Sequence, residues 1–201
     1  MPVHVRRRRV LPLAFCCAAA AAFVQSALPI PLVQGTQVGI SYFQPGDTPQ
    51  GGNGQPVDGI QGSSMEMLKV HIHAHLSLFN NGQQIAVPYG IGLVQPFQLL
   101  NGFVGRASGF YWLHTHDATG IIHIESPTDR VYTLGNFFDV WGEPLTLHNV
   151  AGLQGIVHAF LNGTPYTGNP RDIDLTAHEL ITLEVGRPTV QPPVYIFPTG
   201  L

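Results

Sequence analysis

Apolar and polar residues alternate along residues 67–79, MLKVHIHAHLSLF. One set of alternate positions is apolar and consists of Leu68, Val70, Ile72, Ala74, Leu76 and Leu78. The other set carries Lys69, His71, His73, His75 and Ser77. A period of two residues predicts a β-strand with one buried face. Asn81 and Gly82 follow, and both tolerate positive φ in a tight turn, so residues 83–87 are expected to return as the second strand of a hairpin.

Further short strands are predicted along the rest of the chain. Residues 110–116 and 121–125 flank the turn Asp-Ala-Thr-Gly, and residues 155–161 and 165–166 flank Asn162-Gly163. A last alternating segment covers residues 180–185. Short strands separated by turn residues indicate a mainly β fold, an antiparallel sandwich or barrel.

One segment departs from the β pattern. In YTLGNFFDVWGEP, the residues Leu134, Phe137, Phe138 and Trp141 recur at the spacing of one helix face. Thr133 is a helix-capping residue type, and Gly142 followed by Pro144 ends a helix. This predicts one short amphipathic helix that packs its aromatic side chains against an open end or face of the sheet.

The first residues are typical of an export signal. Four arginines at residues 6–9 precede an apolar run at residues 10–24 and then small residues, which predicts a signal over residues 1–27 and a periplasmic or extracellular location. Ordinary secretion and the twin-arginine route both stay open. The Ala-rich run is short for a spanning helix, and no stable membrane insertion is expected after cleavage; a segment retained as a membrane anchor stays open as the alternative. A Gly/Pro-rich arm or loop at residues 28–62, an all-β domain at residues 63–188 and an extended Pro-rich tail at residues 189–201 would follow.

Charge and cysteine content narrow the functional classes. Cys16 and Cys17 both lie in the predicted signal, which excludes disulfides, cysteine-ligated zinc, thiolate copper sites and cysteine nucleophiles from the mature chain. Nine basic residues less the four in the signal leave five against twelve carboxylates, a formal charge of −7. Such a chain is a poor ligand for nucleic acid or anionic lipid. The sequence identifies no protein partner.

A second group of histidines occurs in YWLHTHDATGIIHIE. Trp112, His114 and His116 share one strand face, and Ile121, His123 and Glu125 share one face of the next strand. If the turn pairs His116 with Ile121, then His114 lies opposite His123, and Trp112 lies opposite Glu125. Cross-strand partners have Cβ atoms roughly 4.5–5.5 Å apart. Three imidazoles and a carboxylate would then form one patch.

Neutral imidazole is a good ligand for zinc and copper, and zinc sites with three histidines keep an open position for water. Because alternate strand residues are ~6.6 Å apart, His71 and His75 lie ~13 Å apart and are not expected to bind one ion. One metal site could combine the second group with a pair from the first strand, either His71 with His73 or His73 with His75. Alternatively, the two groups could form separate metal sites. The predicted metal ligands are His71, His73, His75, His114, His116 and His123. Glu125 and Asp117 are each candidates to orient these ligands, to bind the metal or to act as a general base. Asp117 could equally just shape its turn.

Three blocks, HIHAHL, YWLHTHDATGIIHIESP and YTLGNFFDVWGEPL, resemble in this order an uncharacterised family of exported bacterial proteins. The likeness covers most of the chain after Val57, and the LHTHD and GIIHIES blocks are its specific part. The resemblance implies that relatives carry cysteines near residues 62–64 and 109–110. This chain would then lack a disulfide bridge or a free thiol that its relatives have. The resemblance implies one domain and carries no activity.

Three functions fit these observations. The first is a non-catalytic exported protein that binds copper or zinc; with only Met65 and Met67 in the mature chain, a methionine-rich copper(I) carrier is disfavoured. The second is a metal-dependent, hydrolase-like enzyme in which Glu125 or His73 acts as base. The third is a structural or interaction module with a polar histidine face. No His-Glu-x-x-His, Gly-x-Ser-x-Gly, phosphate-loop or dinucleotide motif favours a particular reaction.

Overall fold

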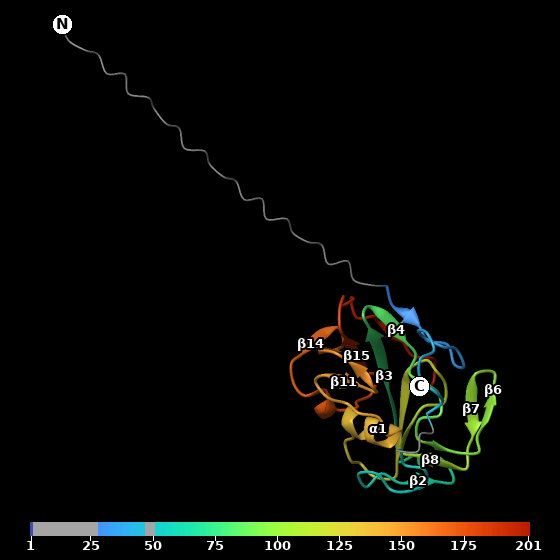
Figure 1. Cartoon of the computed structure of the whole chain (residues 1–201). Coiled ribbons are helices and arrows are strands. Elements are labelled where there is room, and N and C mark those ends of the chain that lie inside the picture. Colours follow the sequence, from blue (N-terminus) through green and yellow to red (C-terminus); the bar gives the residue numbers. More distant parts are fainter. Residues whose placement is uncertain (2–27, 47–50) are drawn as a thin grey trace.

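The computed structural model describes residue 1 and residues 28–46 and 51–201, and the predicted export signal therefore lies outside the described residues apart from Met1. Over these described residues, the fold is mainly β with one short α-helix, as predicted (Figure 1). The helices are α1 (Leu134–Trp141) and the 3₁₀ turn η1 (Pro170–Asp172). The strands are β1 (Ile30–Pro31), β2 (Gly62–Ser63), β3 (Val70–Asn80), β4 (Gln83–Ile85), β5 (Leu93–Val94), β6 (Gln98–Leu100), β7 (Phe103–Arg106), β8 (Gly109–Tyr111), β9 (Leu113–His114), β10 (Ile121–Ser126), β11 (Asn149–Val150), β12 (Leu153–Gln154), β13 (Val157–Leu161), β14 (Thr164–Tyr166), β15 (Leu180–Val185) and β16 (Tyr195–Ile196).

The largest sheet has seven strands in the order β14-β13-β15-β3-β10-β9, with β4 paired to β3. In the described part of the chain this order does not close into a barrel. Most pairs are antiparallel, but β15 runs parallel to β3. About a hundred residues separate these two strands, so no hairpin dictates their relative direction. The large sheet thus combines the expected antiparallel pairs with one parallel pair.

Two of the predicted hairpins form around Asn-Gly turns. Asn81 and Gly82 have φ values of 49° and 80°, and Asn162 and Gly163 have φ values of 49° and 78°. Positive φ at both central residues is the geometry that matches the right-handed twist of paired strands. These turns join β3 to β4 and β13 to β14.

The amphipathic helix forms where it was predicted. The Thr133 hydroxyl accepts a hydrogen bond from the Asn136 amide, the Asn136 side chain accepts one from the Thr133 amide, and Gly142 ends the helix in the left-handed conformation. This capping box satisfies amide groups that have no partner inside the helix. The buried face of α1, Phe137, Phe138 and Trp141, packs in one core with Leu76, Leu78, Ile122, Ile124, Ile181 and Leu183 of the large sheet.

The prediction of one buried face for β3 was wrong, because the histidine face is buried as well. His73, His75 and Ser77 all lie below 4 % exposure. Aromatic side chains from short strands outside the large sheet cover this face: the Phe103 ring of β7 stacks on His116 and the Tyr195 ring of β16 lies 4.3 Å from His75. The alternating pattern records the two faces of the strand but does not reveal what covers the polar one.

The expected arm and tail pair with each other and with the domain. β1 of the N-terminal segment and β16 of the tail form a parallel pair. β2, at the end of the expected arm, pairs with β8, so that Ser63 lies opposite Phe110. No helix among the described residues is long and apolar enough to cross a membrane.

Candidate metal centre

The sheet register brings histidines from three neighbouring strands into one row. His73 on β3 lies directly opposite His123 on β10, and His123 lies opposite His114 on β9, which confirms the predicted cross-strand pair. The ring centroid of His123 is 4.5 Å from that of His73 and 5.3 Å from that of His114. His116, just after β9, adds a fourth ring 4.5 Å from His123. The imidazoles therefore converge on His123.

His114 and His116 are held in one defined orientation. The Nδ1 atom of His114 donates a hydrogen bond to the Tyr111 carbonyl at 2.7 Å, and Nδ1 of His116 donates one to the Val104 carbonyl at 2.5 Å. Because a carbonyl only accepts, each Nδ1 carries the ring proton, and each neutral ring has its lone pair on Nε2. The two Nε2 atoms lie 3.0 Å apart. Two lone pairs thus face each other across a short distance.

A cation between these nitrogens would remove this repulsion, and burial disfavours a proton in that role. Desolvation holds the pKa of His114 well below its ordinary value, with a further contribution from His116, and burial also lowers the pKa of His116 itself. Both side chains are less than 5 % exposed. Two imidazoles on a tetrahedral zinc ion have nitrogens roughly 3.3 Å apart, from metal–nitrogen bonds of about 2.0–2.1 Å. The observed separation fits a shared metal ion.

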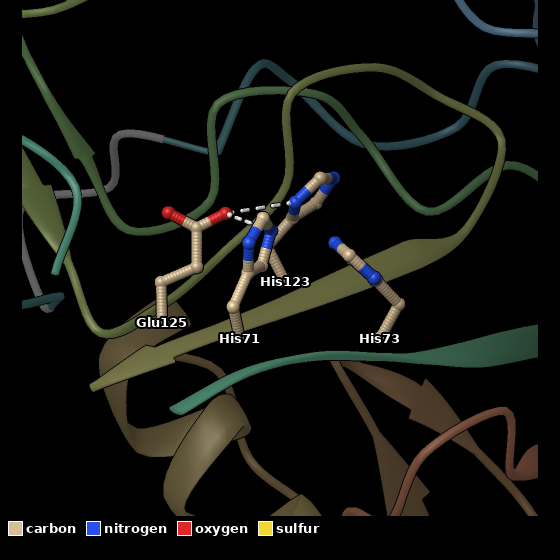
Figure 2. Close-up of side chains that lie close together, drawn as sticks. All are labelled: His71, His73, His123 and Glu125. Atoms are coloured by element: carbon tan, nitrogen blue, oxygen red, sulfur yellow. Dashed lines mark hydrogen bonds and ion pairs between the residues drawn. The ribbon is translucent and has the colours of Figure 1, made fainter. Parts of the chain in front are cut away.

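Glu125 is the carboxylate of the cluster. Its Oε1 atom lies 3.1 Å from Nδ1 of His123, 3.3 Å from Nε2 of His71 and 3.9 Å from Nε2 of His114; Figure 2 shows His71 and His123 approaching it. Burial, reinforced by the charge of Glu66, raises the pKa of Glu125 to about 8. A bound metal cation would favour the ionised carboxylate and lower that pKa.

Six of the eight predicted site residues form two overlapping sets with ligand spacing. Within each set, one donor atom per residue lies within 4.8 Å of the others. The sets are His71, His73, His123 and Glu125, and His114, His116, His123 and Glu125. These buried His and Glu groups could hold a metal ion. Of the two pairings expected for β3, the structure brings together His71 with His73.

The structure places His75 and Asp117 outside both sets. The ring of His75 donates from Nε2 to the Thr119 carbonyl at 2.8 Å. Asp117 accepts from the amides of Thr119 at 3.0 Å and Gly35 at 2.8 Å, and from the Thr119 hydroxyl. Both side chains therefore fix the turn between β9 and β10 and its contact with the N-terminal segment.

Glu66 belongs to the site although the sequence pattern did not single it out. Its Oε1 atom lies 3.5 Å from Nε2 of His116. The side chains of Glu66 and His71 are 40 % and 41 % exposed, whereas the other ring and carboxylate groups of the cluster are buried. Solvent therefore reaches the cluster beside these two residues. The only signal in the sequence was an acidic residue shortly before the predicted strand, at the start of the expected all-β domain.

The site was also compared with known proteins. No protein-family model, no curated protein and no solved structure matches this chain.

Proposed function

We propose that this chain is an exported transition-metal-binding protein that holds zinc or copper on the histidine face of its large sheet. The observation that carries the proposal is the pair of Nε2 atoms of His114 and His116, 3.0 Å apart, with both Nδ1 atoms bound to backbone carbonyls. Metal-ligating histidines characteristically donate their second ring nitrogen in this way, which fixes the tautomer and the ring orientation.

The donor atoms favour zinc or copper over other common ions. Imidazole nitrogens suit Zn²⁺ and Cu²⁺, whereas Mg²⁺ and Ca²⁺ prefer oxygen ligands. The two sets contain no sulfur ligand, which disfavours copper(I). Nδ1 of His123 lies 3.1 Å from Oε1 of Glu125, so Nε2 is the ring nitrogen of His123 that would complete a three-histidine site with His114 and His116.

Metal analysis of the mature chain, purified without a His-tag or chelator, tests this proposal. We expect a transition metal in the wild-type protein and its loss in His114→Ala/His116→Ala. His148→Ala, which removes an exposed histidine, is the matched control and should keep the metal. Wild-type protein that carries no metal and binds neither added Zn²⁺ nor Cu²⁺ would refute the proposal.

A hydrolytic activity is the second candidate, because Glu66 is exposed and lies 3.5 Å from His116 Nε2. A carboxylate in that position can accept a proton from water bound to a neighbouring metal ion. Zinc-loaded protein should then hydrolyse activated esters, and Glu66→Gln should lower the rate while metal content stays the same. Equal rates for the two proteins would refute the catalytic role of Glu66 and leave the metal-binding proposal unaffected.

A further inference from the structure

We propose that the cluster binds two metal ions, the second held by His71 and His73 beside the first, with Glu125 between them. This inference rests on the proposed metal-binding function and extends it from a single ion to a dinuclear centre.

The strand order separates the histidine pairs. His71 and His73 lie on β3, His114 and His116 lie on and just after β9, and β10 runs between them. Among the described residues, the donor atoms that lie within 4.8 Å of one another form two sets, one with His71 and His73 and the other with His114 and His116. Metal–nitrogen bonds of about 2.0–2.1 Å place the ligands of one tetrahedral ion roughly 3.3 Å apart, so one ion does not hold both pairs. Each pair therefore requires its own ion.

The β3 side of the cluster contains unused ligand atoms. Nε2 of His73 and Oε2 of Glu125 are buried and have no hydrogen-bond partner among the described residues. Figure 2 shows the His73 ring beside His71 and His123, with no dashed line to any of them. His73 and Glu125 are 3 % and 2 % exposed, so bulk solvent barely reaches these two side chains. An ion bound by His71 and His73 would supply the partner that these atoms lack.

Glu125 is positioned to serve both ions. Its Oε1 atom is 3.3 Å from Nε2 of His71 and 3.9 Å from Nε2 of His114, so one carboxylate reaches the histidine pair on each side. A carboxylate has two oxygens and can bind two ions at once, and protein sites of this kind hold their metals about 3.5–4 Å apart.

Stoichiometry tests the proposal. Tag-free mature protein is saturated with Zn²⁺, freed of excess by gel filtration and analysed for metal per chain. We expect two ions in the wild type and in His148→Gln, and at most one in His71→Gln/His73→Gln and in His114→Gln/His116→Gln. Thermal unfolding of each variant with chelator present establishes that it still folds.

The outcomes separate this inference from the proposed function. One ion per wild-type chain would overturn the dinuclear centre and leave metal binding intact, whereas none would overturn both. Two ions that both persist in His71→Gln/His73→Gln would place the second ion elsewhere and also overturn it. Electron paramagnetic resonance of the Cu²⁺-loaded wild type decides the question even if a variant fails to fold. Two neighbouring ions give spin–spin interaction, and two isolated Cu²⁺ signals would contradict the shared carboxylate.

Discussion

Acid should destabilise the metal-free protein strongly, and His75 offers the clearest case. The ring of His75 is 1 % exposed, donates from Nε2 to the Thr119 carbonyl and packs on Tyr195. Burial lowers the pKa of His75 to about 4, against an ordinary value of 6.5. The folded state thus keeps this ring neutral over a pH range in which the unfolded chain binds a proton.

The sign and the size follow from that difference. Because the unfolded state binds more protons, the contribution of His75 to the free energy of unfolding is largest above pH 6.5. This contribution decreases as the pH falls toward 4. Complete loss would amount to about 3 kcal/mol, and by pH 4.5 about 2.5 kcal/mol would be gone. The neighbouring buried imidazole of His73, with its pKa also lowered to about 4, adds a loss of the same sign.

Urea unfolding at pH 7 and pH 4.5, with chelator present, measures the effect. His75→Gln removes the titrating group and keeps a side-chain donor for the Thr119 carbonyl. The variant should lose about 2.5 kcal/mol less than the wild type between the two pH values, whereas the exposed-site control His148→Gln should behave like the wild type. Equal losses in wild type and His75→Gln would refute the assignment of a neutral, buried His75.

Four further outcomes are expected. Zn²⁺ bound by His114 and His116, at a hundred times its dissociation constant for that site, should raise the free energy of unfolding by about 2.7 kcal/mol, and His114→Gln/His116→Gln should remove this contribution in a thermal melt. Thr133→Ala should cost about 1 kcal/mol in urea unfolding by removing the helix cap, and Thr133→Ser should restore most of it. Phe138→Ala, at a fully buried position, should cost about 3–5 kcal/mol in the same assay, and a loss below ~1 kcal/mol would contradict its place in the core. Gly120 has a φ of 92°, and in Gly120→Ala the new Cβ would lie 2.4 Å from the Leu76 carbonyl oxygen. The substitution should therefore destabilise the turn between β9 and β10 and weaken Zn²⁺ binding measured by calorimetry. Unchanged binding and stability would refute this prediction.

Local rules predicted the elements that depend on neighbours in sequence. The Asn-Gly turns and the helix from Leu134 to Trp141 each follow from conformational preferences within a few residues. The parallel pairing of β15 with β3 and the burial of the histidine face depend instead on segments far apart in the chain. Periodicity identifies the faces of a strand, but only the assembled fold determines which strands become neighbours and what covers each face.

The candidate site likewise combines contacts that local sequence predicts with contacts that depend on the assembled fold. The placement of His114 opposite His123 follows from a short hairpin, which is why it was predictable. The contact of His73 with His123 requires β3 to pair with β10, and the carbonyls of Val104 and Tyr111 that orient His116 and His114 have no side-chain signal at all. Side-chain pattern therefore identifies candidate ligands, whereas their orientation depends on backbone groups that any residue could supply.

The buried cluster is costly for a fold to maintain without a ligand. Hydrophobic side chains of similar size would fill this face of the sheet without unpaired polar atoms, yet the chain keeps Nε2 of His73 and Oε2 of Glu125 buried with no partner in the described residues. It also directs the lone pairs of His114 and His116 at each other. Conflicts of this kind with the rules of stable packing are expected where function requires them. The two ions of the proposed centre would resolve all three conflicts: one would supply a positive partner to His73 and Glu125, and the other would relieve the repulsion between the rings of His114 and His116.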